Sequence, residues 1–282
     1  MSPVNPVIVA LDVDSPAKAL ALADTLRGAV GAVKVGSQLF TAAGPDIVRR
    51  LTEAGHRVFL DLKYHDIPNT VAGAAAEAAR LGAWIIDVHA SGGIAMMKAA
   101  REAAHASAAK AGVAPPLIIA ITVLTSFDQE TLGSIGVPRP VVEQVDALAW
   151  LAQVAGADGV VASPQEVGRL RAARGDRFVL ITPGIRPAHP SGASGKPKDD
   201  QARTMTPAEA VAAGANYIGV GRPIIAAPDP RAAAVRDYLA GLGIAGDRVQ
   251  IVTKGEESPF CLEETESCFA QNRRGHFIVS SK

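Results

Sequence analysis

Eight short runs of β-branched and other apolar residues recur along the chain, and most of them are followed by a stretch with the composition of a helix. The runs cover residues 7–12, 32–36, 57–63, 84–90, 117–124, 159–163, 178–184 and 217–221. Nearly continuous apolar strands that alternate with helices indicate a parallel sheet whose outer face is covered. Eight such units within about 240 residues predict an α/β fold, a closed (β/α)8 TIM barrel.

The segments between these runs carry the signals of helix ends. Ser15 can cap a helix that has Pro16 in its first turn, and Gly82 can end the Ala-rich helix that starts near Pro68. An open doubly wound sheet is the competing architecture, but the first strand lacks the glycine fingerprint of a dinucleotide-binding fold. We therefore expect a barrel over residues 1–242, closed by a helix over 228–242.

Charge and cysteine content exclude several classes of function. Lys plus Arg and Asp plus Glu number 28 each, so no net field attracts nucleic acid or an anionic membrane. The start of the chain has no basic segment followed by a long apolar one, which predicts a cytoplasmic protein without a membrane segment. The two cysteines, Cys261 and Cys268, lie near the end. The barrel therefore has no thiolate metal site or disulfide framework.

Charged and polar residues gather where the predicted strands end. In a barrel of this kind the active site lies at the C-terminal ends of the strands. The residues at these ends are Asp12, Lys34, Asp61, Lys63, Asp66, His89, Thr125, Pro183, Gly184, Gly221 and Arg222. Their clustering predicts that this rim of the barrel is the functional site.

The segment "DLKYHD" is the densest of these clusters. If the strand is regular, Asp61 and Lys63 point to one face while Leu60 and Leu62 point to the other. Taken alone, an Asp-x-Lys-x-x-Asp pattern is more readily explained by a surface ion pair than by catalysis. The surrounding motifs favour catalysis.

Seven motifs occur in order along the strands: "VALDVD", "VKVGSQLF", "DLKYHDIPNT", "VHASGG", "TVLTS", "TPGIRP" and "IGVGRP". Together they closely resemble the orotidine 5'-phosphate decarboxylase family over residues from about 5 to about 240. The resemblance implies decarboxylation of orotidine 5'-phosphate to UMP in de novo pyrimidine biosynthesis. It also implies that the reaction needs neither a cofactor nor a metal ion.

The resemblance assigns the catalytic residues. It implies an alternating array of Lys34, Asp61, Lys63 and Asp66, in which Lys63 stabilises and protonates a carbanion. In the family the second aspartate reaches the neighbouring subunit's site, so a homodimer is expected, with Asp66 shared across the interface and Thr70 expected beside it.

The resemblance also implies the substrate-binding residues, which are Asp12, Thr70, Thr125, Pro183, Gln201, Gly221 and Arg222. Among them, Asp12 is expected to hold the ribose and Thr125 the pyrimidine. Gln201, Gly221 and Arg222 are expected to hold the phosphate.

A long polar stretch, residues 188–203, follows the seventh strand. Its length exceeds that of an ordinary connection, and we expect a lid over the phosphate, although a disordered surface loop has the same composition. The acidic pair at 199–200 is most simply a solvated loop face. We expect His65 and His89 to be structural, because neither has the partners of a nucleophilic or metal site.

Residues 243–282 continue past the expected barrel as an appended tail whose structure the sequence does not define. From about Tyr238 onward the chain is similar to the end of a peptidoglycan-associated lipoprotein, with "GEESP", two cysteines and "NRR". The ligand-holding part of that domain would lie upstream, where this chain has the barrel, so peptidoglycan binding is not expected. Cys261 and Cys268 would remain thiols in a reducing compartment.

Two other functions remain open. A Mg2+-dependent sugar-phosphate decarboxylase or aldolase of the same barrel superfamily shares the Asp-x-Lys-x-x-Asp pattern, but "DIPNT", Lys34 and Thr125 favour the orotidine 5'-phosphate decarboxylase. A wall-binding or scaffold protein, in which the tail is active and the barrel inert, is the alternative from another class.

Overall fold

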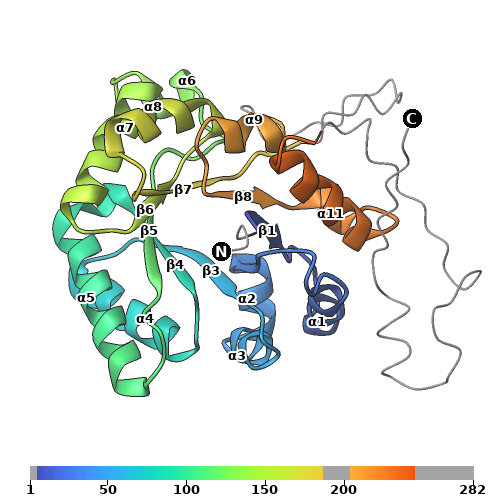
Figure 1. Ribbon diagram of the computed structural model, residues 1–282. Helices are drawn as coiled ribbons and strands as arrows, with labels where there is room; N and C mark the ends of the chain where they lie inside the picture. The colour runs from blue at the N-terminus through green and yellow to red at the C-terminus, as the bar shows by residue number, and fades with distance from the viewer. Residues whose placement is uncertain (1–4, 187–203, 245–282) are drawn as a thin grey trace, which may run out of the picture.

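The structure is a computed structural model, and it describes residues 5–186 and 204–244. Eight parallel strands form a closed barrel in the order β1 to β8, and the helices lie outside it (Figure 1). The last strand pairs with the first, with Val9 opposite Val220, so the sheet has no open edge. This closure confirms the predicted TIM barrel and excludes the open sheet.

The strands are short, as expected for a barrel. They are β1 Val7–Ala10, β2 Ala32–Gly36, β3 Val58–Tyr64, β4 Ile85–His89, β5 Leu117–Ile121, β6 Gly159–Val161, β7 Val179–Thr182 and β8 Tyr217–Val220. The α-helices are α1 Pro16–Thr25, α2 Ser37–Ala43, α3 Asp46–Glu53, α4 Pro68–Arg80, α5 Gly93–Ala111, α6 Gln129–Ser134, α7 Val141–Val154, α8 Val167–Arg174, α9 Pro207–Ala212, α10 Arg222–Ile225 and α11 Pro230–Gly241. Two 3-10 turns, Ala90–Gly92 and Pro164–Glu166, complete the described elements.

Several predicted strands extend too far at their C-terminal ends. The first strand ends at Ala10, and the N–H of Val13 donates to the carbonyl of Leu11 (2.9 Å) in a tight turn that carries Asp12 out of the sheet. The fifth strand ends at Ile121, so Thr125 lies in a loop rather than at a strand end. Apolar residues continue past both ends because the loops also pack on the core, which is why composition alone did not mark the boundaries.

The barrel has two apolar layers because strand side chains alternate between its inside and its outside. One buried cluster fills the interior, and its members are Ile8, Ala32, Phe59, Ile85, Ile119 and Ile181. A larger cluster lies between strands and helices and includes the alternate residues Val7 and Val9 of β1. The positions two residues after Ala32, Phe59 and Ile85 face the same interior. They are Lys34, Asp61 and Asp87, so a charged layer follows the apolar one toward the mouth.

The predicted helix signals are confirmed where the structure describes them. The Ser15 side chain accepts a hydrogen bond from the Lys18 N–H (3.3 Å), and Pro16 is the first residue of α1. Gly82 follows α4 with φ +83°, a left-handed conformation that glycine adopts without strain. None of the helices in the described parts of the chain is both long and apolar enough to cross a membrane.

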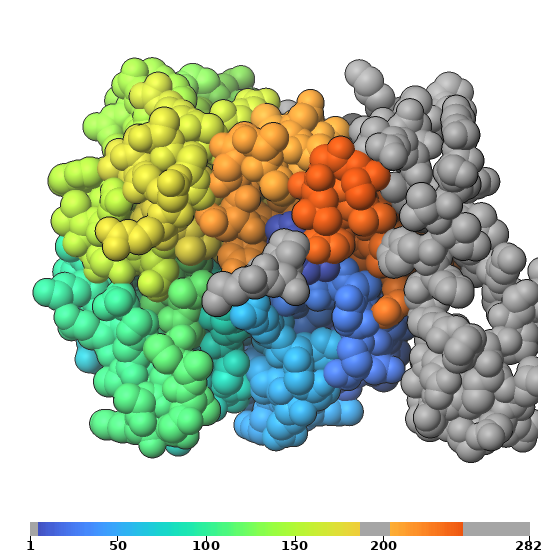
Figure 2. All heavy atoms as spheres, in the orientation of Figure 1, coloured from blue at the N-terminus to red at the C-terminus, as the bar shows by residue number. Residues whose placement is uncertain are grey.

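Helix α11 completes the ring of helices. Asp229 caps it by accepting from the Ala232 N–H (2.9 Å), and the helix packs against α1, α9 and β1. In the space-filling view, the orange-red segment that contains α11 therefore adjoins the blue N-terminal segment (Figure 2). The expected closing helix over 228–242 is thus present. Residues 245–282, which hold most of the expected tail with both cysteines, lie outside the described residues.

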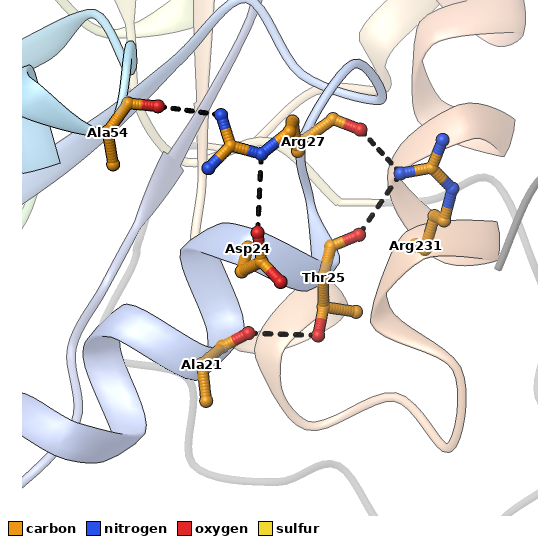
Figure 3. A network of polar contacts seen from close by, with 6 residues as sticks. All are labelled: Ala21, Asp24, Thr25, Arg27, Ala54 and Arg231. Atoms are coloured by element: carbon orange, nitrogen blue, oxygen red, sulfur yellow. Dashed lines mark hydrogen bonds and ion pairs between the residues drawn. The ribbon is translucent and has the colours of Figure 1, made fainter. Parts of the chain in front are cut away.

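One arginine ties α11 to the first helix. Arg231 donates to the carbonyl oxygens of Thr25 (3.1 Å) and Arg27 (2.5 Å), at and just past the end of α1 (Figure 3). Arg27 in turn donates to the carbonyl of Ala54 (2.6 Å) and to Asp24 (3.2 Å). A cation at this point satisfies carbonyls that the helix end leaves without partners.

We expect Arg231→Ala to destabilise the barrel by about 1–2 kcal/mol, because it removes charge-assisted hydrogen bonds to two helix-end carbonyls. The measurement is the urea midpoint of the full chain, followed by circular dichroism. Arg177→Ala, at an exposed arginine outside this network, is the control and should leave the midpoint unchanged. Equal midpoints for both variants would show that the junction contributes nothing.

Candidate active site

The carboxylate of Asp61 lies between two lysine ammonium groups at the mouth of the barrel. Lys34 Nζ is 2.9 Å from Oδ2 of Asp61, and Lys63 Nζ forms an ion pair with Oδ1. Lys34 Nζ also lies 3.6 Å from Oδ1 of Asp12, which extends the chain of charges to the end of β1. The structure therefore brings together Asp12, Lys34, Asp61 and Lys63, as the sequence predicted.

Because Asp61 and Lys34 are largely buried, their ion pairs strongly affect the pKa values of both side chains. Burial alone would raise the pKa of Asp61, but the Lys34 ammonium, a hydrogen bond from Asp87 and the Lys63 ammonium lower it below its ordinary value. Burial alone would lower the pKa of Lys34, yet the carboxylates of Asp61 and Asp12 raise it. Both groups are therefore fixed in their charged forms at neutral pH.

Lys63 has an unusual backbone conformation. Its φ is +52°, and it is the one non-glycine residue with positive φ in the described parts of the chain. Such a conformation costs a residue with a Cβ roughly 1–2 kcal/mol. The pairing between β3 and β4 also shifts here, from Leu60 opposite Ile86 to Tyr64 opposite Val88. A bulge therefore presents Lys63, where the sequence predicted a regular strand.

The predicted division of faces nevertheless holds in this bulged strand. Leu60 is buried in the cluster between strands and helices, and Leu62 packs against the same cluster. Asp61 and Lys63 contact each other on the inner side. The alternation therefore predicted correctly which side chains share a face, but it did not predict the positive φ of Lys63.

Asp87 is a site residue that the sequence analysis missed. It is fully buried on β4, and its Oδ1 accepts a hydrogen bond from the backbone N–H of Lys63 (2.8 Å). Burial, the charge of Asp61 and the interaction between the two carboxyls raise the pKa of Asp87 well above its ordinary value. Asp87 therefore holds a proton, whereas Asp61 is ionised. The available signal was an aspartate inside the apolar run "IIDVH", two residues after an interior isoleucine.

Gly36 is a second residue that the sequence analysis missed. Its role depends on its distance from the side chains of Lys34 and Asp12, which the sequence does not give. A Cβ at this position would lie 3.1 Å from Lys34 Nζ and 3.4 Å from Oδ1 of Asp12. Gly36 is also directly opposite Asp61 in the pairing of β2 with β3. A side chain at residue 36 would therefore displace the Lys34 ammonium, and glycine leaves that space open.

Asp66 and Thr70 lie apart from the three linked residues Lys34, Asp61 and Lys63. Asp66 is exposed, and its Oδ1 accepts from the N–H of Ile67 (2.6 Å). Within the described residues of this one chain it forms no ion pair with Lys63. Thr70 is also exposed, in the first turn of α4. Both residues follow the end of β3 and point away from the array. Asp66, the fourth residue of the predicted array, is therefore not joined to the other three within the described part of a single chain.

The remaining predicted binding residues that the structure describes lie just beyond strand ends or in the loops that follow them. Pro183 follows β7 directly, and Thr125 is half-buried in the loop after β5. Gly221 precedes α10 and lies close to the end of β1, since a Cβ there would be 3.8 Å from Cβ of Ala10 and 3.9 Å from Oδ2 of Asp12. Arg222 is the exposed first residue of α10. Gln201, with the predicted lid and the acidic pair at 199–200, lies outside the described residues.

The two histidines at this face lie close to each other. The rings of His65 and His89 have centroids 5.2 Å apart. Burial, followed by the charges of His65 and Lys63, lowers the pKa of His89, so it is neutral at pH 7. Among the described residues, no group of three or more His, Cys, Asp or Glu side chains is arranged to hold a metal ion.

Comparison with known proteins shows the family to which this chain is similar. The model of the family described as orotidine 5'-phosphate decarboxylase / HUMPS matches residues 5–236. The chain is 54% identical over 230 residues to the orotidine 5'-phosphate decarboxylase of Syntrophotalea carbinolica, covering 82% of this chain and 92% of that protein. It is 51% identical over 241 residues to that of Paramagnetospirillum magneticum, covering 86% of this chain and 100% of that protein.

The chain belongs to the orotidine 5'-phosphate decarboxylase / HUMPS family. Among solved structures it resembles the orotidine 5'-phosphate decarboxylase of Lactobacillus acidophilus, with a TM-score of 0.74 and 40% identity. That match covers 84% of this chain and 99% of the other. All four residues of the predicted array lie inside the family match, which ends within α11 at residue 236.

The charge assignments predict how stability depends on pH. Asp61 has a folded pKa below its unfolded value, so it stabilises the fold above pH 4 or so and loses this contribution as the pH falls. Lys34 has a raised folded pKa, so its contribution is lost only as the pH rises past about 10. We expect Lys34→Met to lower the free energy of unfolding by about 2 kcal/mol at pH 7. The difference from the native chain should shrink below pH 4.

Urea unfolding at a series of pH values measures this difference. Lys98→Met, at a lysine whose side chain is 64% exposed on α5, is the matched control and should cost little at any pH. A Lys34→Met penalty that stayed constant down to pH 3 would contradict the assigned pairing with Asp61.

Proposed function

We propose that this chain removes CO2 from orotidine 5'-phosphate to give UMP, with Lys63 as the group that stabilises and protonates the reacting carbon. The activity follows from the family and from the names of its close relatives, and this reaction is the last step of pyrimidine biosynthesis. The observation that carries the residue roles is the Asp61 carboxylate held between Lys34 and Lys63 at the barrel mouth.

The chemistry requires a fixed positive charge. Breaking the bond between C6 of the pyrimidine and its carboxylate releases CO2 and leaves the electron pair on C6, which has no adjacent carbonyl to delocalise it. An ammonium group placed beside C6 stabilises this charge in the transition state. Lys63 then transfers a proton to C6 to form the C–H bond, and the neutral amine regains a proton from solvent.

The other charged residues orient Lys63. Asp61 is 8% exposed and contacts both lysines, so it holds the Lys63 ammonium in one direction. Lys34 braces Asp61 from the opposite side and links it to Asp12. Because these groups are charged before substrate arrives, the site needs little reorganisation during the reaction.

A second copy of the chain completes the array in this proposal. Asp66 is exposed, two residues beyond the end of β3, and does not pair with Lys63 of its own chain within the described residues. In a homodimer it would reach the other copy's Lys63, with Thr70 beside it at the interface. The neighbouring Ile67 is 67% exposed, which suits a contact surface.

In this proposal, other residues at the mouth of the barrel bind the ribose, the pyrimidine ring and the phosphate of the substrate. Asp12 would hold the ribose, and Thr125 with Pro183 would contact the pyrimidine. The phosphate would bind at the start of α10, where Gly221 and Arg222 offer a backbone N–H and a guanidinium. Gln201 would close this site from the segment 187–203. Its flanks are joined at the mouth, because the N–H of Arg186 donates to the carbonyl of Met205 (3.0 Å).

The proposal also covers the limits of the active unit. Residues 1–242 would form the catalytic barrel, with 243–282 as an appended tail, similar at its end to a peptidoglycan-associated lipoprotein, that takes no part in the reaction. A cytoplasmic location fits a reaction of nucleotide biosynthesis. The Mg2+-dependent alternative of the barrel superfamily differs in one testable property, which is its need for the metal ion.

We expect the native chain to decarboxylate orotidine 5'-phosphate at the same rate with and without EDTA. Lys63→Ala should lower kcat by more than about a thousandfold, because it removes both the charge beside C6 and the proton donor. The assay is the loss of substrate absorbance. Lys98→Ala on α5 is the control and should keep native kcat. Loss of activity in EDTA would support the Mg2+-dependent alternative, and near-native turnover by Lys63→Ala would refute the mechanism.

Shared active sites predict complementation between two inactive variants. Lys63→Ala and Asp66→Ala should each be nearly inactive alone. In a mixed dimer one site carries both changes and the other carries none, so random mixing after partial unfolding should restore about a quarter of native activity. Titrating one variant against the other measures this. A mixture no more active than its components would show that Asp66 does not act across an interface.

A further inference from the structure

Asp87 is a buried acid for which the reaction above has no use. Its side chain is fully buried inside the barrel, two residues after Ile85 of the interior cluster. A buried carboxyl carries a desolvation cost unless its oxygens find partners. No protein donor among the described residues reaches Oδ2 of Asp87, whereas Oδ1 accepts from the N–H of Lys63 at 2.8 Å.

This hydrogen bond lies where the regular backbone pairing between β3 and β4 is interrupted. Between the pairs Leu60–Ile86 and Tyr64–Val88, β3 has three residues where β4 has one, and that one is Asp87. The amide of Lys63 therefore lacks a regular place in the ladder, and a buried amide needs a partner. The Asp87 carboxyl supplies it. The same residue thus fills the gap in the ladder and contacts the residue with positive φ.

We infer that Asp87 is a positioning residue whose carboxyl oxygen binds the backbone N–H of Lys63 and fixes the left-handed turn that directs the Lys63 ammonium onto Asp61. Asp87 also carries a proton next to the Asp61 carboxylate, because burial and the charge of Asp61 raise the pKa of Asp87. A left-handed residue with a Cβ persists only where its surroundings hold it.

The role makes specific demands on the side chain at residue 87. It needs one acceptor for the Lys63 N–H and one donor for Asp61, and a neutral carboxyl provides both. An asparagine provides both as well, through its carbonyl and its amino group. A leucine of similar volume provides neither. Asparagine should therefore substitute for Asp87 while leucine should not, whereas a residue that only fills space would show the reverse.

The test compares Asp87→Asn and Asp87→Leu in the full chain. We expect Asp87→Asn to keep kcat close to native. Asp87→Leu should lower kcat by about a hundredfold with little change in KM, since a misplacement of about 1 Å at the reacting centre has that effect. Its melting temperature should change little, because removal of a buried ionisable group offsets the loss of the acceptor for the Lys63 N–H. Asp237→Leu, at another buried aspartate on α11, is the control and should keep native kcat.

Crystal structures of the two variants give a readout that is independent of activity. In Asp87→Leu, Lys63 should leave the positive-φ region and its ammonium should separate from Asp61, while Asp87→Asn should keep both features. Native kcat in Asp87→Leu, equal losses in both variants, or an unchanged Lys63 backbone in the Asp87→Leu crystal would each overturn the inference. Because the inference rests on the proposed function only for its kinetic consequence, an inactive native chain would refute that function alone and the crystal comparison would still decide the role of Asp87.

Discussion

The ion pairs of one buried carboxylate, Asp61, determine how the mouth of this barrel is organised. A carboxylate that is 8% exposed would be strongly disfavoured without compensation, and two ammonium groups supply it. Each lysine is in turn held in one place by the same anion. In the proposed mechanism, these fixed charges act when the substrate anion binds.

The barrel makes this constellation possible through its layers. Ala32, Phe59 and Ile85 form part of a dry interior cluster, and the charged layer starts two residues further along the same strands. The apolar layer keeps water from reaching the charges from below, which preserves their mutual attraction. Fixed strands also hold Lys34 and Asp61 in register, so their separation is a property of the sheet and does not depend on loop conformations.

The order of the strands predicted the architecture, and period-two alternation predicted that Asp61 and Lys63 face the same side. The place of Lys34 beside Asp61 was implied by the resemblance to the family. The sequence could not predict the left-handed backbone of Lys63, since a bulge is a property of pairing between strands and leaves no local pattern. Asp87 and Gly36 escaped notice because their importance is a distance to a neighbour on another strand. Gln201 and the tail fall outside the described residues, and Asp66 remains a prediction about two chains.

Closure of the barrel links its first and last strands, which has a consequence for the synthesis of the chain. Asp12 follows the first strand and Gly221 the last, yet they are neighbours at the mouth, and Arg231 then fastens the last helix to the first. A nascent chain that has already emerged as far as β4 carries both lysines but has no finished pocket around them. In the proposed mechanism, turnover therefore cannot begin before β8 has left the ribosome and docked beside β1.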